Sequence, residues 1–129
     1  MIYRTLLDIP PYAERAVIIN VETRAISTLA VLSVLRHAAV PLLLIDCEST
    51  DGSWDHFRRL SEETGFDLLS APRRPHGEAL DRIFSELATD RVLLVDSDLE
   101  ILDGEIVERM RDWMSLPQVF GAGFTHGPE

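Results

Sequence analysis

Short apolar runs alternate along the chain with longer segments whose apolar residues recur at helical spacing. Continuous apolar runs of four or five residues are typical of strands that are buried on both faces of a sheet. A weaker run follows Gly65, and the last run is interrupted by glycines. The sequence therefore predicts strands at Val17–Val21, Leu42–Ile45, Phe66–Leu69, Val92–Val95 and Val119–Phe124.

Four helices are expected between or after these strands. Residues 25–38 are apolar nearly all round, as in a helix packed deep against a sheet. The other three carry an apolar stripe along one face. One of these is expected to end at Gly65, and another to begin after Asp103 as N-cap with Glu105 in its first turn. The stripes are Trp54, Phe57 and Leu60; Leu80, Ile83, Phe84 and Leu87; and Ile106, Met110 and Trp113.

Strict alternation of strand and helix predicts an α/β fold, with a mostly parallel, doubly wound sheet and helices on both faces, a three-layer sandwich. Residues 1–15, with Pro10 and Pro11, are interpreted as a lead-in, and residues 16–129 as the domain. Sheets of this kind bind ligands beyond the carboxyl ends of their strands. Residues directly after each apolar run are therefore the candidates for function.

Asp96-Ser97-Asp98 directly follows the fourth strand. Two carboxylates one residue apart can reach a single cation, and Mg²⁺ and Mn²⁺ favour carboxylate oxygens together with substrate phosphates. Such a triplet also occurs as a plain turn or capping signal. Here it lies between two apolar stretches, which favours a site.

Two further strand ends carry polar residues. Asp46 ends the second strand, where its carboxylate could accept a hydrogen bond from a nucleobase, while Ser49–Ser53 is typical of a turn and helix cap. Arg73, Arg74 and His76 follow the third strand in a proline-bounded loop before a helix. Arginines beside a helix N-terminus suit a diphosphate, although a solvated surface loop is an equal alternative.

Charge and composition exclude several classes. The 129 residues carry twelve arginines, no lysine and 22 acidic residues, a net charge of −10. So acidic a chain is poorly suited to nucleic acid and is repelled by anionic lipid. Cys47 is the only cysteine, so neither an internal disulfide nor a thiolate metal cluster is expected. No apolar stretch approaches the ~20 residues of a membrane span, and no signal peptide is evident, which indicates a cytoplasmic protein.

From Ala16 to Phe124 the chain resembles the family 2 glycosyltransferases of GT-A fold. The family's V-D-[DN]-G-S-T-D-G-S is matched by Ile45-Asp-Cys-Glu-Ser-Thr-Asp-Gly-Ser53, and its L-x-x-D-x-D by Leu93-Leu-Val-Asp-Ser-Asp98. Weaker matches are Ile18-Ile-Asn-Val-Glu-Thr-Arg24 and Arg74-Pro-His-Gly-Glu-Ala-Leu-Asp81. The chain departs from the pattern at Asn20, where the family usually has proline, and at Glu48, where glycine is common.

The resemblance implies a nucleotide-sugar-binding domain with a role for each matching position. Asp46 would recognise the nucleobase of a UDP- or GDP-type donor, with Asn20 and Glu22 lining the same pocket. The DXD motif would bind Mn²⁺ or Mg²⁺ through Asp98 and Asp96, with Asp96 and Ser97 near the ribose. Arg74 or His76 would contact phosphate. The acceptor is unknown, and the catalytic base is expected outside this chain.

Two alternatives to a glycosyltransferase remain at this stage. One is a related, non-catalytic module kept for binding or assembly, and pairing at a truncated sheet edge would make a homo-oligomer possible. The other, a nucleotidyltransferase, is disfavoured because residues 22–28 lack the glycine-rich loop that such enzymes place after the first strand.

Overall fold

The computed structural model describes residues 1–123. Five strands form one sheet in the order β1-β4-β3-β2-β5, and every neighbouring pair is parallel. Parallel neighbours need a crossover connection, and each strand is followed by a helical element that provides it. The strands are β1 (Ile2–Tyr3), β2 (Tyr12–Asn20), β3 (Leu42–Asp46), β4 (Asp67–Ser70) and β5 (Thr89–Val95).

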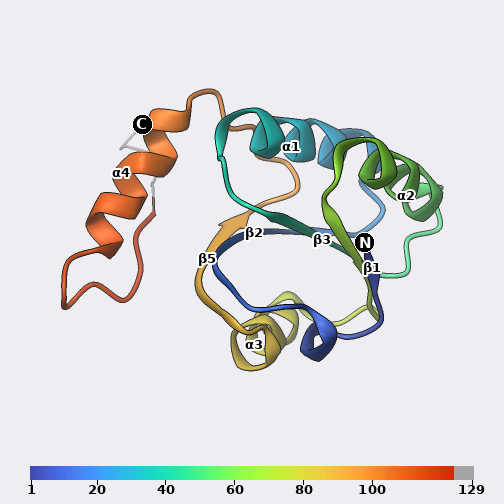
Figure 1. The fold of residues 1–129 in the computed structure, drawn as a ribbon. Coiled ribbons are helices and arrows are strands. Elements are labelled where there is room, and N and C mark those ends of the chain that lie inside the picture. Colours follow the sequence, from blue (N-terminus) through green and yellow to red (C-terminus); the bar gives the residue numbers. More distant parts are fainter. Residues whose placement is uncertain (124–129) are drawn as a thin grey trace.

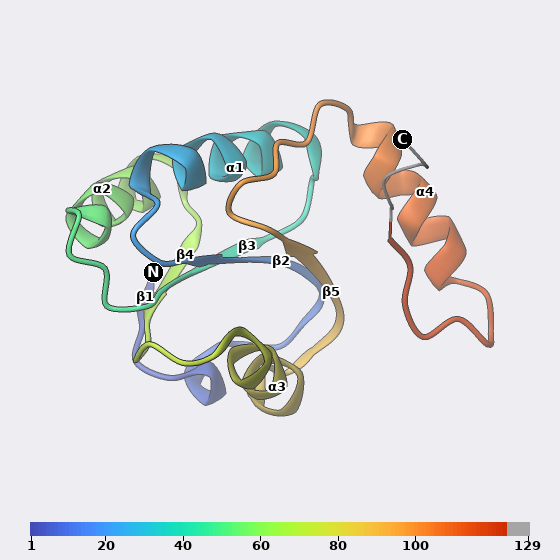
Figure 2. The same cartoon turned by 180° about the vertical axis from the view of Figure 1, so that it is seen from behind.

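Helices cover both faces of this sheet (Figure 1). On one face lie α1 (Arg24–His37) and α2 (Ser53–Thr64), and on the other lie α3 (His76–Glu86) and the short 3₁₀ helix η1 (Leu6–Asp8). The last helix, α4 (Gly104–Met114), stands beyond the β5 edge, as the view from behind shows (Figure 2). The predicted three-layer parallel α/β sandwich is confirmed.

Alternate residues of the central strands supply two separate cores. In β3, Leu42 and Leu44 pack under α1 and α2, whereas Leu43 and Ile45 pack over α3 and η1. All five residues of β3 are buried, which explains its unbroken apolar run. Burial of each such side chain contributes about 1.5–3 kcal/mol, so the middle strands carry much of the stability.

The two chain ends depart from the predicted pattern. Residues 1–15, interpreted as a lead-in, supply β1 and the first part of β2, and Ile2 of β1 pairs with Leu68 of β4. At the other end, residues 119–123 form no strand, and Phe124 lies outside the described residues. Phe120 is 99% exposed there, so this segment buries too little apolar surface to hold it in a sheet. Among residues 1–123, β5 is therefore an edge strand with one strand neighbour.

Within residues 1–123, no helix has both the length and the apolar character needed to span a bilayer.

The end of α1 meets the start of α4 at close range. A Cβ on Gly104 would lie 2.9 Å from the His37 carbonyl oxygen, closer than a Cβ normally approaches backbone. Gly104 thus lets the chain after β5 return against α1 before α4 begins. Asp103 caps α4 by accepting a hydrogen bond from the Glu105 N–H at 2.9 Å, as its sequence position predicts.

Gly104→Ala should therefore destabilise the protein, by about 1–3 kcal/mol, because backbone has to shift to make room. Urea unfolding followed by circular dichroism measures the loss. Gly77→Ala in α3 is the matched control, because its Cβ would meet nothing within 4 Å. There the higher helix propensity of alanine should stabilise by up to about 1 kcal/mol. Equal effects at the two positions would contradict the close packing at Gly104.

Candidate functional site

The order in which the chain adds strands to the sheet reverses between β2 and β5. From β2 the chain steps outward to β3 and β4, and it then returns by way of α3 to place β5 on the other side of β2. The connecting helices leave on opposite faces of the sheet (Figure 1). In open parallel sheets a crevice forms at this reversal, beyond the carboxyl ends of the strands. The candidate residues belong to the loops that begin there.

The ends of β2 and β3 are joined by a buried side-chain network. Asn20 and Asp46 are paired in register, and the Asn20 amide donates to Asp46 Oδ1 at 2.7 Å. Asp46 Oδ2 accepts from the Ser49 N–H at 3.2 Å, while Asn20 Oδ1 accepts from the hydroxyls of Thr23 and Ser27. Asn20 is fully buried and Asp46 is 1% exposed. In this arrangement both side chains hold the loops together and neither faces solvent.

A second, exposed cluster ties three loops together above this network. Glu22, after β2, accepts hydrogen bonds from the Thr50 N–H and hydroxyl and forms an ion pair with Arg73. Arg73, after β4, also donates through Nε to the Cys47 carbonyl at 3.3 Å. Glu22 and Glu48 have φ values of 55° and 49°, a left-handed conformation that is costly for residues other than glycine. These side chains reach solvent, unlike Asn20 and Asp46.

The Asp51 carboxylate accepts hydrogen bonds from the first residues of two helices. Its Oδ2 accepts from the Arg24 N–H at 3.0 Å, at the start of α1, and its Oδ1 accepts from the Ser53 N–H at 3.0 Å, at the start of α2. Burial acts to raise the pKa of Asp51, but hydrogen bonds from Ser53 and Arg24 outweigh it, and the pKa lies below its usual value. The capping interpretation of residues 49–53 agrees with this geometry.

Asp96-Ser97-Asp98 forms a tight turn at the end of β5. The Leu99 N–H donates to the Asp96 carbonyl at 3.0 Å, which closes the turn. Ser97 is half-buried, whereas Asp96 and Asp98 are exposed. Within residues 1–123, neither carboxylate receives a hydrogen bond or an ion pair. These two acidic groups therefore differ from Asp46, whose oxygens are already occupied.

The loop after β4 places its charged residues apart from one another. Arg73 turns to Glu22, whereas Arg74 pairs with Glu78 of α3 at 3.3 Å across one helical turn. His76 is the first residue of α3. Arg74 is therefore near the predicted helix N-terminus, but its described partner is a carboxylate.

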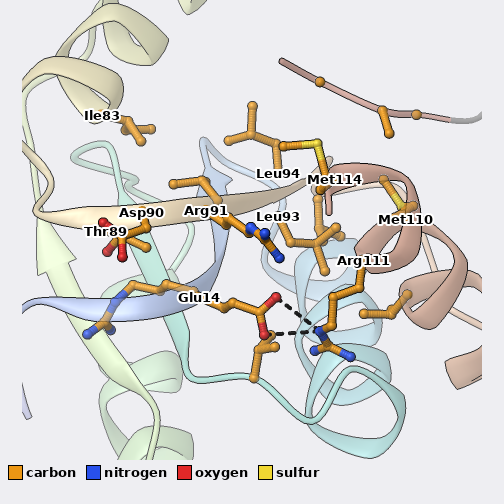
Figure 3. A pocket seen from close by; sticks show the side chains of 18 of the residues that line it. Glu14, Ile83, Thr89, Asp90, Arg91, Leu93, Leu94, Met110, Arg111 and Met114 are labelled. Carbon is orange, nitrogen blue, oxygen red and sulfur yellow. Dashed lines mark hydrogen bonds and ion pairs between the residues drawn. The ribbon is translucent and has the colours of Figure 1, made fainter. Parts of the chain in front are cut away.

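A cavity of about 630 Å³ runs along the outer edge of β5, between α3 and α4. Asp96 lines it together with apolar side chains such as Leu94, Met110 and Met114. Figure 3 shows Arg111 of α4 reaching Glu14 of β2, with Arg111 Nε 3.0 Å from both carboxylate oxygens. Hydrogen bonding to Glu14, against the opposing effect of burial, raises the pKa of Arg111. This pair ties α4 to the sheet.

No cluster of three or more histidine, cysteine or acidic residues able to hold a metal occurs in residues 1–123. A metal at Asp96 and Asp98 would thus take its remaining ligands from water and substrate phosphate, as Mg²⁺ usually does. Cys47 is not suited to serve as a metal ligand in place of these carboxylates. Burial, and then the charge of Asp46, raise the pKa of its thiol, which disfavours the thiolate.

Sequence reasoning identified the strand ends but missed the partners of the buried pair. Thr23, Ser27 and Arg73 were not predicted to contact the candidate residues. Ser27 gave a usable signal, because it is a polar residue on a helix that is otherwise apolar nearly all round. Arg73 gave none, since its contact with Glu22 joins residues 51 positions apart.

Comparison of the chain with models of protein families, with curated proteins and with solved structures finds no match in any of the three.

Asp51→Asn should cost about 1 kcal/mol at pH 7, because an asparagine has one acceptor oxygen and can satisfy only one of the Arg24 and Ser53 N–H groups. Because folding lowers the pKa of Asp51, its contribution is complete above the unfolded-state pKa, about 3.9, and is lost as pH falls below it. The stability gap between the two proteins should therefore narrow as pH falls below about 5 and close only below the folded-state pKa of Asp51. Urea titrations at each pH measure it. Asp81→Asn, an exposed carboxylate in the middle of α3, should show no such gap.

Asn20→Asp should be far more damaging, because it sets a second carboxylate against the buried oxygen of Asp46. We expect a loss of about 3–5 kcal/mol at pH 7, as when a buried ion pair is broken. Protonation of one carboxyl relieves the repulsion, so the folded pair holds a proton to higher pH than the unfolded chain does. Stability should therefore recover on lowering the pH, and fall again as pH rises.

Glu22→Gln is the control for that substitution, since the exposed pair with Arg73 should contribute about 1 kcal/mol or less. A small, pH-independent loss for Asn20→Asp would show that Asn20 and Asp46 are not in contact in solution.

Proposed function

We propose that the chain binds a nucleoside diphosphate sugar with Mg²⁺ or Mn²⁺ at the sheet reversal, as the donor-binding part of a glycosyltransferase. The observation that carries this proposal is the pair of exposed carboxylates of Asp96 and Asp98, which have no partner among residues 1–123. They lie at the end of β5, beside β2, where parallel sheets bind ligands. The resemblance of Leu93–Asp98 to the family's DXD strand supports the same assignment.

The donor set fits a hard divalent cation. Asp98 and Asp96 offer carboxylate oxygens and no soft ligand, which suits Mg²⁺ or Mn²⁺ and disfavours zinc or copper. Two carboxylates from the protein leave positions for phosphate oxygens and water. The cation would supply charge neutralisation at the departing diphosphate.

The chain's own residues would hold the donor around that cation. Ser97 lies between the two carboxylates, close to where a ribose would approach. Arg74 could exchange Glu78 for a donor phosphate at little cost, because exposed ion pairs contribute about 1 kcal/mol or less. Asn20 and Asp46 would support the pocket from beneath. The half-buried Glu22 is linked to them through its backbone N–H, which donates to the Ser49 hydroxyl. No residue of the chain is assigned as general base.

The second candidate is a module of the same fold that binds or assembles without catalysis. The hydrogen bonding of Asp46 favours this non-catalytic module, since both carboxylate oxygens of Asp46 accept hydrogen bonds within the protein. A nucleobase would have to displace Ser49 or Asn20 to reach this carboxylate. Ligand binding separates the two candidates.

Thermal unfolding in the presence of UDP, GDP, UDP-sugars and GDP-sugars, with and without Mn²⁺, tests the proposal. One of these nucleotides should stabilise the protein only when metal is present, by about 2.7 kcal/mol at a hundred times its Kd. Asp98→Asn should abolish this effect, and Asp96→Asn should weaken it. Asp90→Asn, at the opposite end of β5, is the matched control and should leave binding unchanged.

Two outcomes contradict the proposal in different ways. If no nucleotide with metal raises the unfolding temperature, donor binding is refuted and the assembly module is favoured. If a nucleotide binds equally well without metal or in Asp98→Asn, donor binding stands and the metal role of Asp98 is refuted.

A further inference from the structure

The two edges of the sheet differ in how much backbone they offer for pairing. One edge is β1, which is only two residues long. The other is β5, which is seven residues long and has no strand neighbour beyond it in residues 1–123. Natural edge strands are usually short, charged or covered, because their free N–H and C=O groups can pair with another chain. β5 is thus the edge at which a further strand can add.

The carboxyl half of β5 has the side chains of an interior strand. Val92-Leu-Leu-Val95 carries no charge and no proline, and such unbroken apolar runs are typical of strands that are buried on both faces. In β3, which has a strand neighbour on each side, every residue is buried. In β5 only Val95 is buried, and Leu94 is 40% exposed. The apolar surface of β5 therefore exceeds what residues 1–123 cover.

Two helices extend this apolar surface beyond the strand. α3 and α4 pack against opposite faces of the sheet, through Ile83 and Val107. Between them, along the outer edge of β5, lies the cavity of about 630 Å³. Phe84 of α3, 62% exposed, lines it from one side, and Met110 and Met114 of α4 line it from the other. Side chains of an added strand would alternate between its two faces, so one set would contact α3 and the other α4.

The charges along this edge that lack a partner are mostly negative. Three of the charged residues that line the cavity are held in ion pairs, namely Glu14, Arg15 and Arg111. The three that form no ion pair in residues 1–123 are Asp90 and Asp96, at the two ends of β5, and Arg91. The whole chain carries a net charge of −10. The edge therefore favours an occupant with basic residues on either side of its apolar part.

We propose that the outer edge of β5 takes an added strand, namely an extended segment of another polypeptide that is apolar in its middle and basic at both ends. The backbone of this segment pairs with β5, and its apolar side chains enter the cavity on the α3 side and the α4 side in turn. Its basic ends meet Asp90 and Asp96. Only Asp96 is shared with the proposed donor site, so the test is run without nucleotide or metal.

Two other occupants fit this edge less well. In a second copy, α4 also stands beyond the β5 edge (Figure 2), so two such edges cannot meet without displacing both helices. Two chains of net charge −10 would also repel each other. A small apolar ligand would fill the cavity, but it would cover the backbone groups of the edge without giving them partners, which is costly.

Three fluorescein-labelled peptides of about eight residues, near the length of a typical strand, test the proposal with the full chain. The first carries four β-branched apolar residues between pairs of lysines. The second has glutamates in place of the lysines, and the third keeps the lysines but has proline at a central position. Fluorescence anisotropy should show that the first binds about tenfold more tightly than either of the others, a difference of about 1.4 kcal/mol. Proline removes an N–H that strand pairing uses, whereas ionic attraction alone would not distinguish the first peptide from the third.

Leu94→Asn should weaken binding of the first peptide about tenfold, because it removes an exposed apolar side chain of β5 from the cavity. Leu29→Asn on α1 is the matched control and should have no effect, since Leu29 is 57% exposed but does not line the cavity. Circular dichroism and urea unfolding confirm that each variant is folded. Phe84→Gln replaces Leu94→Asn if the latter is not.

Several outcomes overturn the added strand. Equal affinity for the first and third peptides would show ionic attraction without strand pairing, and equal or tighter binding of the glutamate peptide would contradict the basic ends. No binding of the first peptide at about 1 mM, or binding that Leu94→Asn leaves unchanged, would show that the edge does not take it. Dimerisation in analytical ultracentrifugation that Leu94→Asn abolishes would assign the edge to a second copy instead.

Discussion

The hydrogen bond between Asn20 and Asp46 sets the geometry of the loops that follow β2 and β3. It joins the last residues of β2 and β3, which the sheet register already places side by side. From this pair, Thr23, Ser27 and Ser49 carry the network into the loops before α1 and α2. A buried polar group costs about 1–3 kcal/mol when it lacks a partner, so each member keeps the others in place. The network thereby joins the loop after β2, which carries Glu22, to the loop after β3, and Arg73 of the loop after β4 binds to both.

The carboxylates at the ends of β3 and β5 have opposite surroundings, although the sequence places both directly after an apolar strand. Asp46 is enclosed and its oxygens are satisfied, whereas Asp96 and Asp98 stand in solvent. The difference follows from position in the sheet. β3 has a strand neighbour on each side and helices above and below, but within the described residues 1–123 β5 has a strand neighbour on one side only. Beyond that edge, the ion pair of Arg111 with Glu14 holds α4 to the sheet. The cavity lies between β5 and α4.

Apolar runs and helical spacing predicted the architecture because β2 and β3 pack into a core on each face of the sheet, and because Gly65 and Asp103 end and begin their helices by local chemistry. The strand positions in turn located Asn20, Asp46, Asp96 and Asp98 at the strand ends, but not Thr23 and Ser27, which bind Asn20. Partners that are distant in the sequence could not be predicted. Arg15, fully buried and bound to Asp67 of β4, reads in the sequence as a surface charge, and the two-residue β1 has no periodicity to detect. The absence of a strand in residues 119–123 depends on tertiary burial that an apolar run alone does not reveal.

The order of the strands also determines when the sheet can form during synthesis. β2 gains its first neighbour as soon as β3 is made, but its other side stays unpaired until Thr89–Val95 emerges. Likewise, Ile2 of β1 cannot pair until Leu68 of β4 has been synthesised. Such distant pairings close slowly, because loop entropy is lost before the contacts form. A nascent chain would thus hold an early β2-α1-β3 unit with an apolar open side, the stage most exposed to aggregation and to capture by chaperones.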